Sequence, residues 1–206
     1  MQEPRRYRSD VRAKAAGETR ERLVAAAAKL LRSKGVAGFS LDAVGKEAGV
    51  TRLTVYNQFG SRRALLEAVF DDRARQGGLH RLREAMNDPH PQTGLRQLIE
   101  IFCDFWSFDQ EAIASLHRAG SGDAEFEASI KARNERRRDA ISVLVAKMNE
   151  REEVRAEAMI DLTDLLFVIT SFPVFSQLTG GGRKKDAACA LIQAAAEDAI
   201  RRASAR

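Results

Sequence analysis

The sequence has few of the residues on which enzymes and metalloproteins most often depend. Its 206 residues include three histidines, His80, His90 and His117, and two cysteines, Cys103 and Cys189. It contains no Gly-x-Ser-x-Gly, no His-Glu-x-x-His and no complete phosphate-loop motif, and the cysteines lie far apart without metal or redox spacing. We therefore expect no catalytic site, no metal site and no cofactor, and we interpret the cysteines as buried thiols.

Long apolar runs are also scarce. The longest covers residues 165–175, which include Thr170, Ser171 and Pro173, and it is too short to cross a bilayer. The N-terminal segment is polar and charged, unlike a secretory signal, and it lacks the apolar face of a membrane-surface helix. The sequence thus predicts a cytoplasmic protein without membrane association, and its 44% apolar content is enough for a core.

The basic residues are concentrated near the N-terminus. Residues 1–73 carry 15 lysines and arginines against 9 acidic residues, whereas the remaining 133 residues carry 19 against 20. This asymmetry favours a nucleic-acid-binding face in the first third of the chain. We expect residues 1–17 to form a flexible basic arm, either a simple disordered terminus or a segment that follows phosphates or enters a minor groove.

Helical patterns account for the rest of the chain. Thr19 is predicted to cap a first helix whose apolar stripe is Leu23, Ala27, Leu30 and Leu31. Later helices are predicted over about 61–77, 123–149, 153–179 and 184–203. Between the first two of these, one helix includes Leu95 to Trp106, and a short one is capped by Asp109 and ends near Gly120. Within 123–149, the run of arginines at 136–138 is expected on a solvated face. With the two short helices described next, this is an all-α fold of about nine helices.

Residues 40–60 predict two short helices joined by a tight turn. Ser40 is a favourable N-cap, and Gly49 can adopt the left-handed conformation that ends a helix sharply. Thr51 is predicted to cap the second helix, with Val55 and Phe59 facing inward. Two helices of this size around one glycine are typical of a helix-turn-helix.

Arginines occupy unusual positions at two consecutive helix starts. Arg52 follows the Thr51 cap, and Arg62 and Arg63 follow a predicted cap at Ser61. A cation at this end opposes the helix dipole, so these starts are unfavourable in isolation. A docked phosphate would reverse that, because backbone N–H groups and arginines would share the anion. One such arginine is usually just solvated, but three in this arrangement favour contact with a phosphate backbone.

This segment resembles the DNA-binding domain of the TetR (tetracycline repressor) family of bacterial transcription regulators. The residues that carry the resemblance are Phe39–Leu41, Val44, Ala48–Thr51, Thr54–Tyr56, Phe59–Ser61 and Ala64–Leu66. The resemblance covers about residues 18–70, and the remainder is similar to the family only in length and helical pattern. It implies an N-terminal three-helix helix-turn-helix domain at 18–64, with the helix from 61 as a bridge. Residues 65–206 would form a larger ligand-binding and dimerisation domain.

The resemblance also implies which residues contact double-stranded operator DNA. Arg52 and Leu53 lie where the family reads bases, and they suit guanine and a thymine methyl group respectively. Thr54 and Tyr56 suit phosphates, while Gln58 stands where many relatives carry histidine. The complete set expected to bind DNA is Ser40, Thr51, Arg52, Leu53, Thr54, Tyr56, Asn57, Gln58, Arg62 and Arg63.

Large apolar residues lie on the helices that surround the effector pocket in this family. They are Phe102, Phe105, Trp106, Ile113, His117, Phe126, Phe167 and Phe172. Each could equally be ordinary core. Trp106 and His117 are the strongest candidates, because each joins an apolar body to a polar group. The composition of the set suggests a small lipophilic effector of unknown identity.

The last two predicted helices, 153–179 and 184–203, suggest a homodimer. The first is apolar nearly all round between 165 and 175 and must be covered on both sides, while the second is rich in alanine. Two such helices from each subunit would form a four-helix, twofold interface. We expect a homodimeric repressor that binds a palindromic operator and is released by the effector. The alternative is a regulator of the same fold with no ligand switch or with an activating role.

Overall fold

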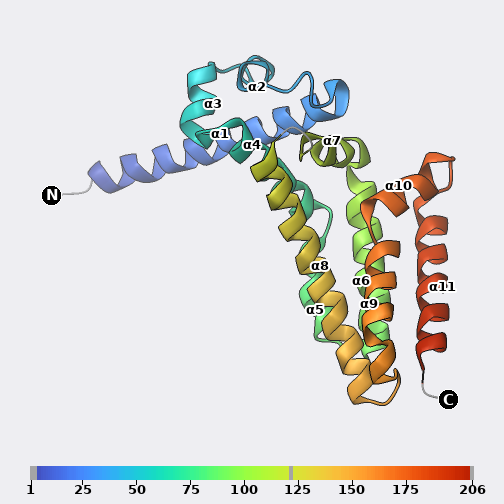
Figure 1. Cartoon of the computed structure of the whole chain (residues 1–206). Helices are drawn as coiled ribbons and strands as arrows, with labels where there is room; N and C mark the ends of the chain where they lie inside the picture. Colours follow the sequence, from blue (N-terminus) through green and yellow to red (C-terminus); the bar gives the residue numbers. More distant parts are fainter. Residues whose placement is uncertain (1–3, 121–122, 205–206) are drawn as a thin grey trace. The chain divides into compact units, whose positions relative to one another are not determined.

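The computed structural model describes residues 4–120 and 123–204. Within these ranges every regular element is helical, with eleven α-helices and two 3₁₀ helices, which confirms the all-α fold (Figure 1). Contacts between Cα atoms divide the chain into two units. The first comprises Met1–Asp72 and Glu111–Glu127, and the second comprises Arg73–Gln110 and Ala128–Arg206. The first unit therefore extends beyond residue 64, where the sequence placed the boundary, and also includes a later segment.

The first unit is built on α1 (Pro4–Lys34). It also contains α2 (Leu41–Ala48), α3 (Arg52–Phe59), the start of α4 (Arg62–Gln76), α7 (Gln110–Gly120) from Glu111 onward, and the start of α8 (Ala124–Glu150). The predicted apolar stripe of α1 is fully buried, as expected. The buried Ser115 Oγ of α7 donates a hydrogen bond to Leu31 O at 2.9 Å, which explains why this later segment belongs to the first unit.

The predicted start of the first helix at Thr19 is wrong, because α1 begins at Pro4 and includes residues 4–17 of the expected arm. Residues 1–3 of the expected arm lie outside the described residues. Proline is favoured at the first helical position, and the arginine, alanine and lysine residues that follow are strong helix formers. Thr19 Oγ1 donates to Ala15 O at 2.8 Å, a bond made inside a helix and not by a cap. The sequence did not predict this part of α1 because the residues before Leu23 form no apolar stripe.

The helix-turn-helix has the predicted caps. Ser40 Oγ accepts a hydrogen bond from Ala43 N at 3.1 Å, and Thr51 Oγ1 accepts one from Thr54 N at 3.2 Å. Gly49 adopts the left-handed conformation at φ +69° and ends α2. Figure 1 shows α2 and α3 beside α1, and the side chains that hold these helices together are Phe39, Val44, Val55 and Phe59.

A close backbone approach fixes the turn between α2 and α3. A methyl group added at Gly45 would lie 2.9 Å from Val50 O and 3.3 Å from Arg52 N. These neighbours are backbone atoms, which cannot rotate away as a side chain could. Only glycine therefore allows α2 to pass so close to the start of α3.

The second unit contains the remaining helices. They are the end of α4, η1 (Leu79–Arg81), α5 (Leu82–Met86), α6 (Pro91–Phe108), most of α8, η2 (Ala156–Ala158), α9 (Met159–Ile169), α10 (Phe172–Gly180) and α11 (Lys185–Ala203). Within this unit α11 packs against both α6 and α9 (Figure 1). The α6 side chains Leu98, Phe102 and Phe105 are buried with Leu144 of α8 and Leu166 of α9.

The helix predicted over 153–179 is interrupted after Ile169. Ser171 is extended, and α10 then begins at Phe172 with Pro173 in its first turn. In a continuous helix Pro173 would have to donate to the carbonyl of Ile169, but proline has no N–H group. This break and the unpredicted α5 account for eleven α-helices where nine were expected.

In the described ranges no single helix is long and apolar enough to cross a bilayer. Ala156–Ile169 and Phe172–Gly180 satisfy the length and composition criteria only as a pair, and that pair is bent by 47°.

The close approach at Gly45 leads to a stability prediction. Gly45→Ala should lower the free energy of unfolding by about 1–3 kcal/mol, because the backbone around Val50 must move. Gly17→Ala is the matched control, since a Cβ there meets no atom within 4 Å. As a mid-helix substitution in α1 it should raise the same free energy by about 0.5–1 kcal/mol. Urea unfolding of both variants measures the difference, and an unchanged or more stable Gly45→Ala protein would contradict this account.

Candidate nucleic-acid interface and effector site

One face of α3 presents large side chains to solvent. Leu53 is 65% exposed and Tyr56 is 55% exposed, and Arg52 and Asn57 are exposed beside them. The opposite side of the helix is anchored by the buried Val55. A leucine and a tyrosine exposed together on one eight-residue helix are typical of a surface that binds a partner.

The N-terminus of α3 combines free donors with a cation. Thr51 caps the helix, and its hydroxyl lies 3.0 Å from that of Thr54, which is half-buried. Arg52 occupies the first helical position, and the first turn contains no acidic residue. This end of α3 can therefore receive an anion through N–H groups, hydroxyls and a guanidinium.

Arg20 holds the other end of α3, a role that sequence reasoning missed. Its Nη1 donates to Gln58 O at 3.0 Å, and its guanidinium lies 4.3 Å from the ring centroid of Phe59. A cation at a helix C-terminus is favourable. Because Arg20 is contributed by α1, no local pattern around α3 could have revealed it.

The arginines at the start of α4 have partners within the protein, whereas Arg52 has no ion pair or side-chain hydrogen bond with any described residue. Ser61 caps α4, as predicted, by accepting from Ala64 N at 3.0 Å. Arg62 is half-buried, with Nε donating to Phe39 O at 3.4 Å and the guanidinium 5.4 Å from the Phe39 ring centroid. Arg63 forms an ion pair with Glu125. To contact a phosphate, the Arg62 and Arg63 side chains would have to break these interactions or share their donors between the protein and the phosphate.

The eight candidate effector residues divide between the two units. Ile113, His117 and Phe126 belong to the first unit, and Phe102, Phe105, Trp106, Phe167 and Phe172 belong to the second. Ile113 and Phe126 are fully buried. His117 is half-buried, and its Nδ1 bonds Ile113 O at 3.0 Å within α7, so part of its polar capacity is used by its own helix.

The second unit brings four of the predicted aromatic residues into one buried cluster. The ring centroid of Trp106 lies 5.7 Å from that of Phe102, 4.6 Å from that of Phe105 and 5.5 Å from that of Phe172. Trp106 Nε1 donates to Thr170 O at 3.0 Å. The cluster therefore joins α6 to the break between α9 and α10.

Arg137 corrects the prediction of a solvated arginine run. It is only 4% exposed, and its guanidinium lies 5.7 Å from the Phe102 ring centroid and 4.2 Å from that of Phe167. Burial, together with the neighbouring charge of Arg138, lowers the pKa of Arg137 to about 10. The sequence did contain a signal, because Arg137 lies four residues before the buried Ile141, on the apolar stripe of α8.

The two cysteines are buried, as predicted, but the fold brings them together. The Cys103 thiol of α6 and the Cys189 thiol of α11 lie close enough to influence each other's ionisation. The interaction with Cys189, and then burial, raise the pKa of the Cys103 thiol. Among the described residues, no group of three or more histidine, cysteine, aspartate or glutamate side chains could hold a metal ion.

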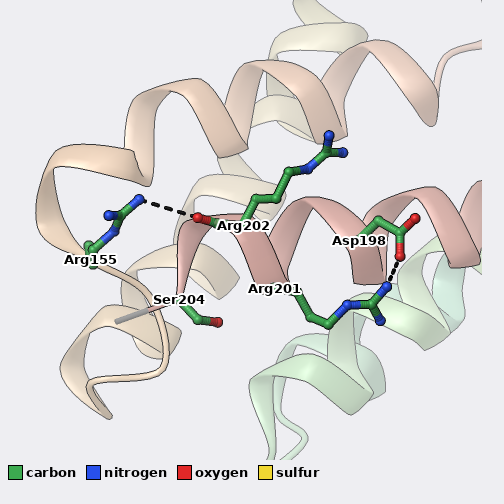
Figure 2. A pocket seen from close by; sticks show the side chains of 5 residues that line it. All are labelled: Arg155, Asp198, Arg201, Arg202 and Ser204. Carbon is green, nitrogen blue, oxygen red and sulfur yellow. Dashed lines mark hydrogen bonds and ion pairs between the residues drawn. The ribbon is translucent and has the colours of Figure 1, made fainter. Parts of the chain in front are cut away.

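A separate cavity of about 580 Å³ lies at the C-terminal end of α11 (Figure 2). Arg155, Asp198, Arg201, Arg202 and Ser204 line it. Arg155 Nη2 donates to Arg202 O at 3.2 Å, which serves a terminal carbonyl of α11, and Arg201 pairs with Asp198. The lining is polar and includes none of the candidate effector residues, so this cavity does not fit the expected lipophilic ligand.

Comparison of the sequence with known proteins agrees with this geometry. Residues 23–69 match the family model of bacterial regulatory proteins, tetR family. A 58-residue stretch is 40% identical to TtgW of Pseudomonas putida, an uncharacterized HTH-type transcriptional regulator. That stretch is 28% of this chain and 43% of TtgW, so the match spans less than half of the relative.

Solved structures share the fold over most of the chain. A TetR-like transcriptional regulator from Rhodococcus sp. RHA1 has a TM-score of 0.70 at 20% identity, over 89% of this chain and 96% of its own. NalD, the secondary repressor of the MexAB-OprM multidrug efflux pump in Pseudomonas aeruginosa, has a TM-score of 0.71 at 18% identity over the same shares. At these identities the likeness concerns the fold alone. In its matched segment, residues 23–69, and in its fold, the chain is similar to the TetR family of bacterial regulatory proteins.

Proposed function

We propose that this protein is a homodimeric transcriptional repressor that binds a palindromic operator through α3 and is released by a small lipophilic effector. The observation that carries the proposal is the outward face of α3, where Arg52, Leu53 and Tyr56 are exposed on a helix capped at its start. The repressing direction is supported by NalD, which has a similar fold and is itself a repressor.

The contacts divide by chemistry into base and phosphate contacts. Arg52 can grip guanine with two hydrogen bonds, and the exposed Leu53 can meet a thymine methyl group. Thr51, Thr54, Tyr56 and the more distant Ser40 suit phosphates. Asn57 and Gln58 can reach either, and Arg62 and Arg63 would add charge at the backbone.

Direct DNA binding tests this proposal. Fluorescence anisotropy should show two protomers binding the DNA immediately upstream of the protein's own gene, and much weaker binding to a scrambled duplex, at two salt concentrations. Equal, salt-sensitive binding to both duplexes would move the search to selection from random DNA. Selection that enriched no common sequence would contradict a sequence-specific regulator.

Substitution of two arginines separates base readout from backbone contact. Arg52→Ala should weaken binding to the operator by about 1–3 kcal/mol and relax preference at one base position in each half-site. Arg62→Ala should weaken binding to all sequences alike and flatten the salt dependence by about one unit of slope. Because Arg62→Ala also loses the hydrogen bond to Phe39 O, the melting temperature of this variant is measured to check that the protein is still folded. Identical behaviour of the two variants would show that this division of contacts is wrong.

The homodimer is proposed from an uncovered apolar face on α9 and α11. On α9, Ile160, Leu165 and Val168 are 76%, 42% and 54% exposed, although Leu162 and Leu166 of the same helix are buried. Leu191 of the adjacent α11 is 43% exposed. Apolar side chains on the outer face of two packed helices are suited to a second copy of the same face in a twofold bundle.

A charge on this face should break the dimer without unfolding the protomer. Val168→Lys is expected to raise the dimer dissociation constant at least about tenfold, because the ammonium group would be buried at the interface. Val143→Lys is the matched control, since Val143 is a helical valine of the same unit, 46% exposed on α8. Sedimentation velocity measures both variants. An unchanged dimer in Val168→Lys, or equal loss in both, would place the interface elsewhere.

The effector response separates the proposal from a regulator without a ligand switch. An effector must bind the DNA-free state more tightly, so it should raise the melting temperature and lower operator affinity together. A compound that raises the melting temperature but leaves operator affinity unchanged is a ligand but not an effector.

A further inference from the structure

The guanidinium of Arg137 is buried, and no described residue of the chain supplies it with a counter-ion. Its Nη1 donates to Phe167 O at 2.6 Å and to Thr170 Oγ1, both of which are neutral acceptors. Its Nε is buried and has no hydrogen-bond partner among the described residues. No carboxylate of residues 4–120 or 123–204 lies within ion-pair distance of Arg137.

The same unit shows how a compensated buried arginine is arranged. Arg73 is 7% exposed, and its Nη1 lies 2.9 Å from Oδ2 of Asp109, which is also buried. Arg138, next to Arg137 in the chain, is matched by Asp164 and Glu135. Arg137 is more deeply buried than either and has only uncharged acceptors. Burying a cation in this way is costly unless an anion joins it.

Aromatic rings surround this cation. Phe102 and Phe167 lie over the guanidinium, and Phe102 also contacts Trp106, which in turn contacts Phe172. Phe167 is half-buried, and the guanidinium of Arg138 lies 4.2 Å from its ring centroid, as does that of Arg137. Of the two rings over the Arg137 guanidinium, that of Phe167 is therefore the more exposed.

We propose that Arg137 anchors the carboxylate of an amphipathic organic acid whose apolar body packs against Phe102, Trp106, Phe167 and Phe172. One guanidinium calls for a single negative charge, so the ligand is a lipophilic monocarboxylate. The unpartnered Nε supplies a donor that a carboxylate can use. The inference rests on the proposed function, in which a lipophilic effector binds this protein, and it adds the charge of that effector.

Alternatively, Arg137 has only a structural role, in which its bonds to Phe167 O and Thr170 Oγ1 hold α8 against the end of α9. In that structural role Arg137 would affect the stability of the protein, but it would not make the protein bind an acid more tightly than the matching alcohol. The single tryptophan of the sequence, Trp106, lies in the cluster, so its fluorescence reports binding at this place.

The experiment titrates the full-length protein with decanoate and 4-cyclohexylbutanoate, and separately with decan-1-ol and 4-cyclohexylbutan-1-ol, below any micelle concentration. Wild type should bind the carboxylates about 10- to 100-fold more tightly than the alcohols, as Trp106 fluorescence measures. Arg137→Met should abolish this preference while still binding the alcohols. Arg138→Met should keep it, because that arginine already has acidic partners.

Equal binding of acids and alcohols by wild type would overturn the anchor, and so would an unchanged preference in Arg137→Met or no fluorescence response to any probe. If Arg137→Met had a lower melting temperature but the same preference for carboxylates over alcohols, Arg137 would have only the structural role. Operator affinity is measured in parallel. Carboxylates that bind through Arg137 but leave operator affinity unchanged would support the anchor and contradict the effector-released repressor.

Discussion

The surface that we propose contacts DNA depends on one close backbone approach, between Gly45 of α2 and the turn that leads into α3. With 2.9 Å between a hypothetical Cβ at Gly45 and Val50 O, the two helices can be this close only because the side chain is absent. Gly49, at φ +69°, turns the chain sharply enough to make that approach possible. Once the start of α3 is fixed, burial of Val55 determines its rotation, and Arg52 and Tyr56 must then face outward. The composition of the exposed face is thus a consequence of packing on the other side.

The electrostatics of α3 are uneven in a way that packing does not require. At the C-terminal end, Arg20 donates to Gln58 O, where a cation complements the helix dipole. At the N-terminal end, Arg52 opposes the dipole and no acidic residue offsets it. Functional sites are the places where a sequence is expected to depart from such local rules. An anion at this end would remove the conflict, which is why the N-terminus of α3 is the part of the first unit best suited to DNA.

Sequence patterns predicted the elements whose signals are local. The caps at Ser40 and Thr51, the stop at Gly49 and the stripe of α1 from Leu23 depend on neighbours a few residues away, and all were confirmed. Features that depend on distant partners were missed. Arg20 and the pairing of Cys103 with Cys189 join segments that only the fold brings together. The helical start of α1 was missed for another reason, because a helix without an apolar stripe has no periodicity to detect.

The break between α9 and α10 links the aromatic cluster to the buried charge. Because α9 ends at Ile169, Ser171 N donates to Val168 O and not to Phe167 O, the carbonyl that it would serve in a continuous helix. Phe167 O is served by Arg137, and Thr170 O by Trp106. These carbonyls need a donor, but they do not need a charge. A neutral amide side chain could serve Phe167 O without the cost of burying a cation. The presence of arginine at position 137 is therefore not explained by the helix end alone, and its unused charge is what an acidic ligand would neutralise.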